Sequence, residues 1–425
     1  MVIWMIISSD EKPLYFRCLR ENYGTGIISE ERFLDTDVQR EFEEKRHRTN
    51  ALSEPRITAN DWQPGKVLLL PTQSCTCKCD HCWVFGTPDS ECVLTPEQLR
   101  AIRANLTVDG KLPVVTVSGG EFFTHHSFRE ILADFPVQCI YTNGFWGYTP
   151  EKCHSYLQDV LKAVSGNTAI DLSKLTLILS YDHRHSENFR VPIESALAGI
   201  ISGAYHIIPE ANLRISQSLR NQRDIQIDPL IRELQAAGFT VGTAEKSAWN
   251  GSILTKSYSY GSHGKPGKTL YADFFPETRI GRAILRNPDQ SPGGTNSHNK
   301  KTWWDDMPLS RHQYVIGPDA GLGIYTILYA PPVPYCAGNL VDMPWRKIEE
   351  RLRCDPIATA LQTLGLPAVW AYMDACIDTG LRECLLKNTQ TIQQFMYLLV
   401  LEPERRLQMN LFLAELLHLK GIWQN

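Results

Sequence analysis

The chain has 425 residues, of which 43% are hydrophobic and 21% charged, and its formal net charge is −4. This length allows one large α/β domain and a smaller one, and the composition is typical of a globular protein. The charge does not favour nucleic acid or an anionic membrane, so we expect neither as a partner.

The cysteines indicate metal binding rather than a disulfide scaffold. There are twelve in the chain, too few for a disulfide-rich protein, and four of them lie within residues 75–82. Such clustering is typical of a metal site in a reducing compartment. Residues 1–7 are apolar but too short to span a bilayer, and they lack the features of a signal peptide. We therefore expect a cytoplasmic protein.

The sequence divides into three parts. Residues 1–64 form an N-terminal extension with an amphipathic stretch at 29–48 that predicts a helix, followed by a linker. Residues 65–245 form a core in which apolar strands alternate with helices. Residues 246–425 form a C-terminal extension.

The core favours a parallel sheet covered by helices on both faces. The predicted strands are 67–70, 114–117, 137–141, 175–180, 213–219 and 239–242. The predicted helices are one that begins after Thr95, then 128–135, 150–164, 191–203 and 228–237. This order predicts an α/β fold, a partial (β/α)6 barrel with parallel strands, and its reactive residues should follow the carboxyl ends of the strands.

The C-terminal extension starts with a polar region and ends in helices. Residues 243–310 are rich in Gly, Ser, Asn, Lys and Pro, which predicts long loops. Residues 311–345 predict a β-hairpin. The predicted helices that follow are 345–353, 357–364, 369–384 and 388–419.

The most informative stretch is residues 75–82, Cys-Thr-Cys-Lys-Cys-Asp-His-Cys. Cys75, Cys79 and Cys82 have the spacing C-x3-C-x2-C, and Cys77 falls outside this frame. Three thiolates on one loop can hold three corners of a four-iron–four-sulfur (4Fe–4S) cluster and leave one iron open, since such clusters normally have four cysteine ligands. The alternatives are half of a zinc site, for which the chain supplies no second ligand pair, and a strained or redox-active disulfide.

Polar residues follow the next three predicted strands at the same edge of the sheet, where parallel strands place their carboxyl ends. The candidate site residues there are Gly119, Gly120, Glu121, Thr142, Asn143, Ser180 and Asp182. Glycines allow a backbone to approach a ligand closely, and a carboxylate can accept hydrogen bonds from an ammonium group. The bland alternative is a set of ordinary turns.

The cysteine loop followed by Gly-Gly-Glu resembles the motifs of the radical S-adenosylmethionine (radical SAM) enzymes, over about residues 66–242. The resemblance implies that Cys75, Cys79 and Cys82 ligate a 4Fe–4S cluster whose open iron chelates the amino and carboxylate groups of S-adenosylmethionine (SAM). It implies reductive cleavage of SAM to a 5′-deoxyadenosyl radical that abstracts a hydrogen atom from the substrate. A flavodoxin- or ferredoxin-like protein would be the electron donor.

The resemblance also implies contacts to SAM. Glu121 would bind the SAM ammonium, and His81, which precedes the last cysteine of the loop, would lie near the adenine. Thr142 and Asn143 would face the ribose, unless they only cap a turn.

The segment from Ser180 to Arg190 resembles the region after the fourth strand in peptide-modifying radical SAM enzymes. There a serine and an arginine hold the SAM ribose or carboxylate, so the resemblance assigns Ser180, Asp182 and Arg190 to SAM binding. The alternative for Arg190 is an ordinary surface charge. Ser216, with Gln217, would border the adenine.

Residues 317–348 resemble the hairpin and helix of SPASM/Twitch extensions, in which cysteines bind auxiliary clusters. Most of those cysteines are missing here, and we expect one cluster per chain. Three interpretations of Cys336 remain open: a buried apolar residue, a catalytic donor of a hydrogen atom to a substrate radical, and a cluster ligand.

The expected activity is therefore that of a radical SAM enzyme acting on a peptide or natural product. A sugar or nucleoside is the alternative small-molecule substrate. A zinc-binding interaction protein without enzymatic activity is the alternative of another class.

Overall fold

The computed structural model describes most of the core and parts of the two extensions. The described residues are 11–23, 65–182, 185, 192–219, 227–243, 246–250, 253–262, 267–276, 313–324, 336–388 and 392–423. The predicted helix at 29–48 and Arg190 lie outside them.

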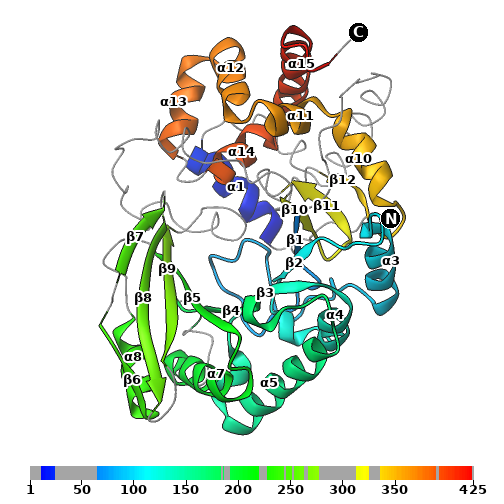
Figure 1. The fold of residues 1–425 in the computed structure, drawn as a ribbon. Coiled ribbons are helices and arrows are strands. Elements are labelled where there is room, and N and C mark those ends of the chain that lie inside the picture. The colour runs from blue at the N-terminus through cyan, green and yellow to red at the C-terminus, as the bar shows by residue number, and fades with distance from the viewer. Residues whose placement is uncertain are drawn as a thin grey trace.

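The described strands form one open, largely parallel sheet (Figure 1). Its order is β12-β11-β10-β1-β2-β3-β4-β5-β9-β8-β6, with β7 paired to β8, and every neighbouring pair from β10 to β9 is parallel. The strands are β1 (Lys66–Leu69), β2 (Val114–Val117), β3 (Val137–Thr142), β4 (Thr176–Ser180), β5 (Asn212–Leu219), β6 (Phe239–Val241), β7 (Lys246–Asn250), β8 (Ile253–Ser262), β9 (Lys268–Pro276), β10 (Gln313–Ile316), β11 (Gly321–Ile324) and β12 (Cys336–Asn339). The predicted α/β class with an open parallel sheet is confirmed.

Two expectations about this sheet are wrong. The sixth predicted strand exists as β6, but it pairs with β8 in the antiparallel sense, and β9 takes the place beside β5. The polar region 243–310 is not all loop, because β7, β8 and β9 lie within it. Buried and more exposed side chains alternate over residues 258–261 of β8 and 270–274 of β9, as on a sheet with one wetter face, and such polar residues resemble a loop in the sequence.

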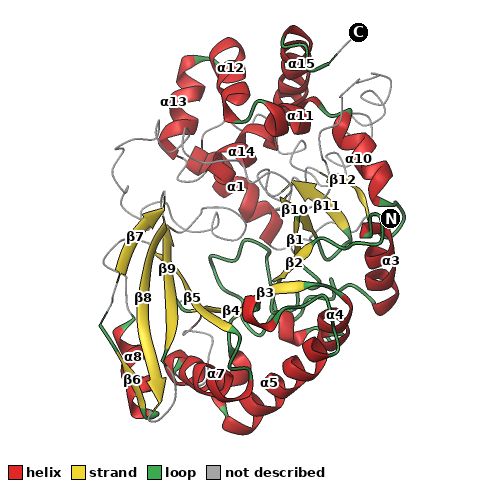
Figure 2. Ribbon diagram, in the orientation of Figure 1, coloured by secondary structure: helices red, strands yellow, loops and turns green. Residues whose placement is uncertain are grey.

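Helices of the core pack along the sheet (Figure 2), and α5 contacts both α4 and α7. These helices are α3 (Pro96–Leu106), α4 (Phe128–Asp134), α5 (Pro150–Ser165), α7 (Ile193–Ile207) and α8 (Asp228–Ala236). The predicted start of α3 is confirmed in detail: Thr95 and Gln98 form a reciprocal capping box, which satisfies amide groups that a helix start leaves unpaired.

The C-terminal helices gather on the far side of β10–β12 from α5, where α1 (Glu11–Tyr23) contacts α13 (Figure 1). They are α10 (Trp345–Arg353), α11 (Pro356–Thr363), α12 (Leu366–Cys376), α13 (Thr379–Asn388), α14 (Ile392–Leu401) and α15 (Pro403–Leu419). The predicted helix 388–419 is interrupted at Pro403, which cannot continue a helix and starts α15 instead. None of the described helices is long and apolar enough to cross a membrane.

The predicted C-terminal hairpin is present as β10 and β11, with β12 added antiparallel to β11. It is continuous with the core, because β10 pairs with β1 in a parallel register that joins Gln313 to Lys66. The hairpin therefore extends the sheet at the strand that leads into the cysteine loop.

Candidate functional site

One cavity of about 240 Å³ lies at the carboxyl ends of β1 to β5. Five successive segments contribute to it, as expected for a parallel sheet. The lining residues include Cys75, Cys77, Cys79, His81, Cys82, Ser118, Gly119, Gly120, Glu121, Tyr141, Thr142, Asn143, Ser180, Asp182, His185, Ser216 and Ser218. Every residue that the sequence assigned to the site is in this set except Gln217, Cys336 and Arg190, the last of which is outside the described residues.

The cysteine loop is closed by backbone hydrogen bonds at its base. Thr87 N donates to Gln73 O and Cys75 N donates to Thr87 O, each at 3.1 Å, and Gln73 N donates to Cys92 O at 2.9 Å. The Gln73 side chain donates to Val84 O at 2.6 Å. This clamp fixes both ends of the segment that carries the four thiols.

The thiols of Cys75, Cys77 and Cys79 form one buried group, against which Cys82 packs. Backbone amides point at two of the sulfurs: Cys77 N donates to Cys75 Sγ at 3.4 Å, and Gly86 N donates to Cys82 Sγ at 3.1 Å. Hydrogen bonding to Cys77, together with burial, raises the pKa values of Cys75 and Cys79. The hydrogen bonds with Cys75 and Cys79 lower the pKa of Cys77.

Thiols that share protons in this way resist simultaneous ionisation. A positively charged metal centre removes that resistance, because a coordinating thiol is deprotonated outright. The buried thiols, the amide donors directed at their sulfurs and the adjoining cavity thus fit an iron–sulfur cluster. Cys75, Cys79 and Cys82 would hold it.

The Gly-Gly-Glu segment packs directly on the cysteine loop. Gly120 N donates to Thr72 O at 2.7 Å, and Glu121 N donates to Ser74 O at 2.8 Å. A Cβ atom on Gly120 would lie 2.3 Å from Ser74 O, and one on Gly119, whose φ is +133°, would lie 2.5 Å from Thr72 O. The glycines are therefore required for contact between two backbone segments, in addition to any contact with a ligand.

The Glu121 carboxylate is buried and accepts three hydrogen bonds from the protein. Oε1 accepts from Phe123 N at 3.1 Å and from Thr142 Oγ1 at 2.8 Å, and Oε2 accepts from Asn143 N at 2.7 Å. Burial raises the pKa of Glu121 to about 7 despite these donors. A carboxylate has about four acceptor positions, so one remains for a ligand at the cavity.

Asn143 connects the Gly-Gly-Glu segment to the thiols. Its backbone amide is bonded to Glu121, and its Nδ2 lies 3.6 Å from both Cys75 Sγ and Cys77 Sγ and donates to Thr76 Oγ1 at 3.1 Å. The Thr142 hydroxyl is used within the protein, since it donates to Glu121 Oε1 and also accepts a hydrogen bond from Trp146 Nε1 at 3.1 Å. Both side chains therefore cap the turn, since Thr142 Oγ1 accepts from Gly144 N and Asn143 Oδ1 accepts from Phe145 N, each at 3.0 Å, and Asn143 also reaches the sulfurs.

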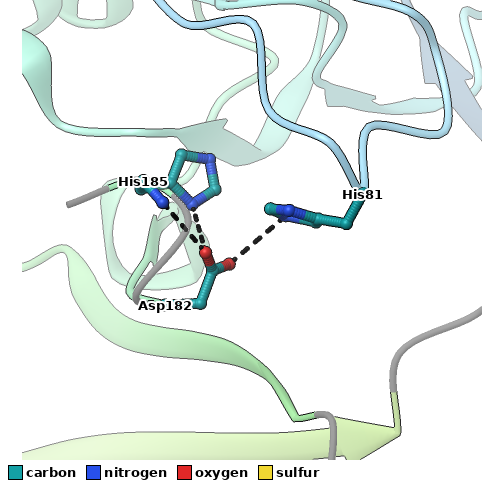
Figure 3. Close-up of side chains that lie close together, drawn as sticks. All are labelled: His81, Asp182 and His185. Carbon is teal, nitrogen blue, oxygen red and sulfur yellow. Dashed lines mark hydrogen bonds and ion pairs between the residues drawn. The ribbon is translucent and has the colours of Figure 1, made fainter. Parts of the chain in front are cut away.

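His81, Asp182 and His185 form a polar group on the cavity wall (Figure 3). Asp182 Oδ2 lies 3.5 Å from His81 Nε2, and Asp182 Oδ1 lies 3.0 Å from His185 Nδ1. Burial opposes ionisation of Asp182, but the two histidines hold its pKa well below the usual range. Burial likewise opposes protonation of His81, yet hydrogen bonds to Asp182 and Asp80 raise its pKa to about 9.

Three donor atoms of this group lie within 4.8 Å of one another, a spacing that a divalent cation also tolerates. The ion pairs alone account for the arrangement. His185 is three residues after Asp182, and this i,i+3 spacing is the signal by which the sequence could have placed it in the site.

Strands β4 and β5 complete the wall. Ser180 is paired in register with Ser216, and both line the cavity, as does Ser218. Side chains alternate across a strand, so Gln217 points to the opposite face and is absent from the described lining residues. Gln217 is therefore not placed to contact an adenine bound in this cavity.

Cys336 lies behind the cysteine loop rather than in the cavity. It is buried with Leu70, Val84 and Val315, and its Sγ donates to Gly338 O at 3.3 Å. Cys82 packs against the same group from the loop side. This placement matches the interpretation of Cys336 as a buried apolar residue, and hydrogen donation to a substrate stays a prediction.

Comparisons with known proteins place these features in context. No family model matches the chain. It is 27% identical over 117 residues to a protein of Bacillus subtilis (strain 168) described as putative peptide biosynthesis protein YydG. The aligned region covers 26% of this chain and 34% of YydG. The match thus spans about a third of that relative.

Two solved structures of Streptococcus suis SuiB, one described as bound to S-adenosylmethionine, each cover 79% of this chain and 81% of SuiB at 12% identity. Their TM-scores are 0.31 and 0.30. The two motifs of this chain that resemble those of radical SAM enzymes are the C-x3-C-x2-C loop after β1 and the Gly-Gly-Glu segment after β2, and they meet at one cavity of the open sheet.

Proposed function

We propose that this chain is a radical SAM enzyme that modifies a peptide. The observation that carries the proposal is the convergence of Cys75, Cys79 and Cys82 with Gly119–Glu121 on one cavity. A cluster held by the three cysteines, with SAM at its open iron, would supply one-electron cleavage of SAM and a carbon radical able to abstract a hydrogen atom from the substrate.

The remaining residues of the cavity would bind and orient SAM. The free acceptor position of Glu121 suits the SAM ammonium, and the hydroxyls of Ser180 and Ser216 at the strand ends suit its ribose. The His81–Asp182–His185 group would fix the wall beside the last cysteine, since its ion pairs join the loop to the end of β4. In such enzymes the protein supplies binding and orientation, and the cofactors supply the difficult chemistry.

The peptide as substrate is supported by the description of YydG as a peptide biosynthesis protein, over the quarter of this chain that matches it. An external flavodoxin- or ferredoxin-like protein would deliver the electron, in the cytoplasm.

The proposal is tested by anaerobic purification and reconstitution. We expect about four irons and four sulfides per chain, the content of one four-iron cluster, and formation of 5′-deoxyadenosine from SAM after reduction with dithionite. The variant Cys79→Ala should lack both, and Cys92→Ala, which changes a cysteine outside the cavity, should retain both. A colourless wild-type protein that contains zinc and no sulfide would overturn the assignment.

The substrate is tested separately by co-expression with short peptides encoded beside the gene. A mass or stereochemical change that depends on Cys79 supports the peptide proposal. Turnover of a free sugar or nucleoside, with none of a peptide, would contradict it and leave the radical SAM assignment intact.

A further inference from the structure

Cys77 is a fourth thiol in the cavity, although the C-x3-C-x2-C frame assigns it no role. Its side chain is only 2% exposed, and it shares one buried group with Cys75 and Cys79. Thr76 Oγ1 lies 3.7 Å from its Sγ. The loop therefore presents four thiols to one cavity, the number that an iron–sulfur cluster normally uses.

Asn143 places Cys77 close to the Gly-Gly-Glu segment. Its Nδ2 lies 3.6 Å from Cys77 Sγ and equally far from Cys75 Sγ, while its backbone amide donates to Glu121 Oε2 at 2.7 Å. Cys77 is thus joined through a single residue to the Gly-Gly-Glu segment. That segment flanks the position at which a ligand of the open iron would bind, so Cys77 lies beside the position that SAM would take.

From this placement we propose that Cys77 is a displaceable fourth ligand, which binds the open iron until SAM replaces it. The inference rests on the proposed function. In the exchange, the bond between iron and Cys77 sulfur breaks, and the amino nitrogen and a carboxylate oxygen of SAM bind. The released thiolate takes up the proton that the SAM ammonium loses, and no oxidation state changes.

Such a ligand has two consequences for the protein. The open iron is closed to other small molecules until SAM is bound. The apparent affinity for SAM is reduced by the fraction of molecules in which Cys77 is released, because only that fraction is competent to bind. If Cys77 occupies the iron in about nine of ten molecules, its removal lowers the apparent Kd for SAM about tenfold.

The test uses reconstituted full-length protein and two variants, Cys77→Ala and Cys77→Ser, with Cys92→Ala as the control from the same closed loop. Iron and sulfide content, the electron paramagnetic resonance (EPR) spectrum of the reduced cluster with and without SAM, and the Kd for SAM are measured. Cyanide, added without SAM, is the probe for an open iron.

We expect all three variants to keep wild-type iron and sulfide content. The Cys77 variants should bind SAM about tenfold more tightly, and cyanide should change their EPR spectra while leaving those of wild type and Cys92→Ala unchanged. With saturating SAM the four spectra should coincide.

Three results would overturn the inference. Identical spectra and equal Kd values in wild type and both Cys77 variants would show that Cys77 does not bind the iron, and the proposed function would stand. Loss of the cluster in both Cys77 variants would make Cys77 a permanent ligand. A wild-type protein with no iron or sulfide would overturn the proposed function itself.

Discussion

Glu121 offers the sharpest test of the site, because its carboxylate joins two segments of the cavity wall, its own segment after β2 and the end of β3. It accepts hydrogen bonds from Phe123 N, Thr142 Oγ1 and Asn143 N. In Glu121→Gln the side chain keeps its shape, but one oxygen becomes an amide NH2 group. Whichever way that amide is turned, at least one protein donor then faces another donor.

The structure sets the size of the effect. One buried donor left without an acceptor costs about 1–3 kcal/mol. If the glutamine turns its NH2 group toward Asn143, only the Asn143 backbone N–H loses its acceptor. If it turns the other way, Phe123 N and Thr142 Oγ1 both lose their acceptor. The first orientation is the less costly, so we expect a loss of about 1–3 kcal/mol in the free energy of unfolding.

The first orientation also disturbs Asn143, whose side chain lies 3.6 Å from two sulfurs. SAM should therefore bind the variant more weakly by about tenfold or more, since loss of a charge-assisted hydrogen bond costs about 1.5–3 kcal/mol. The measurements are urea unfolding of the cluster-free protein, and SAM titration of the reconstituted protein with its iron content as control. Wild-type stability together with wild-type SAM affinity would refute the assigned role of Glu121.

Three further predictions concern single residues. Cys79→Ala should abolish bound iron in a colorimetric assay while Cys92→Ala retains it, and iron retained in Cys79→Ala would show that the ligand frame is wrong. Gly120→Ala should lower the unfolding midpoint and weaken SAM binding, because the new Cβ would lie 2.3 Å from Ser74 O. Gly166→Ala, whose Cβ would meet nothing closer than 3.6 Å, should be close to neutral. Equal effects of the two substitutions would contradict the packing argument. His125 is buried, and burial lowers its pKa from 6.5 to about 4, so the folded state binds this proton less readily than the unfolded state. Protonation of His125 therefore favours the unfolded state. The free energy of unfolding should fall by about 2–4 kcal/mol on this account as the pH decreases from 6.5 toward 4. Urea unfolding at several pH values should show a shallower decline for His125→Gln, and an unchanged slope would exclude His125 as the cause.

The sequence by itself determined the parallel core and the place of the site. Continuous apolar runs identified β1 to β5, and the Thr95–Gln98 pair marked the start of α3, because strands buried on both faces and helix caps have local patterns. The order of polar segments after these strands placed the cysteines and Gly-Gly-Glu at one edge, because parallel strands end on the same side of the sheet.

The tertiary structure decided which strands pair beyond β5 and what the polar side chains contact. The pairing of β9 with β5, and of β6 with β8, depends on residues far apart in the chain, and half-exposed strands carry polar residues that resemble loops. The same holds for Cys77, since spacing along the chain describes the three cysteines of the motif, while the contact with Asn143 exists only after β3 is placed beside β2. The sequence thus determined the chemistry available at the sheet edge, and packing between distant segments decided which groups meet there.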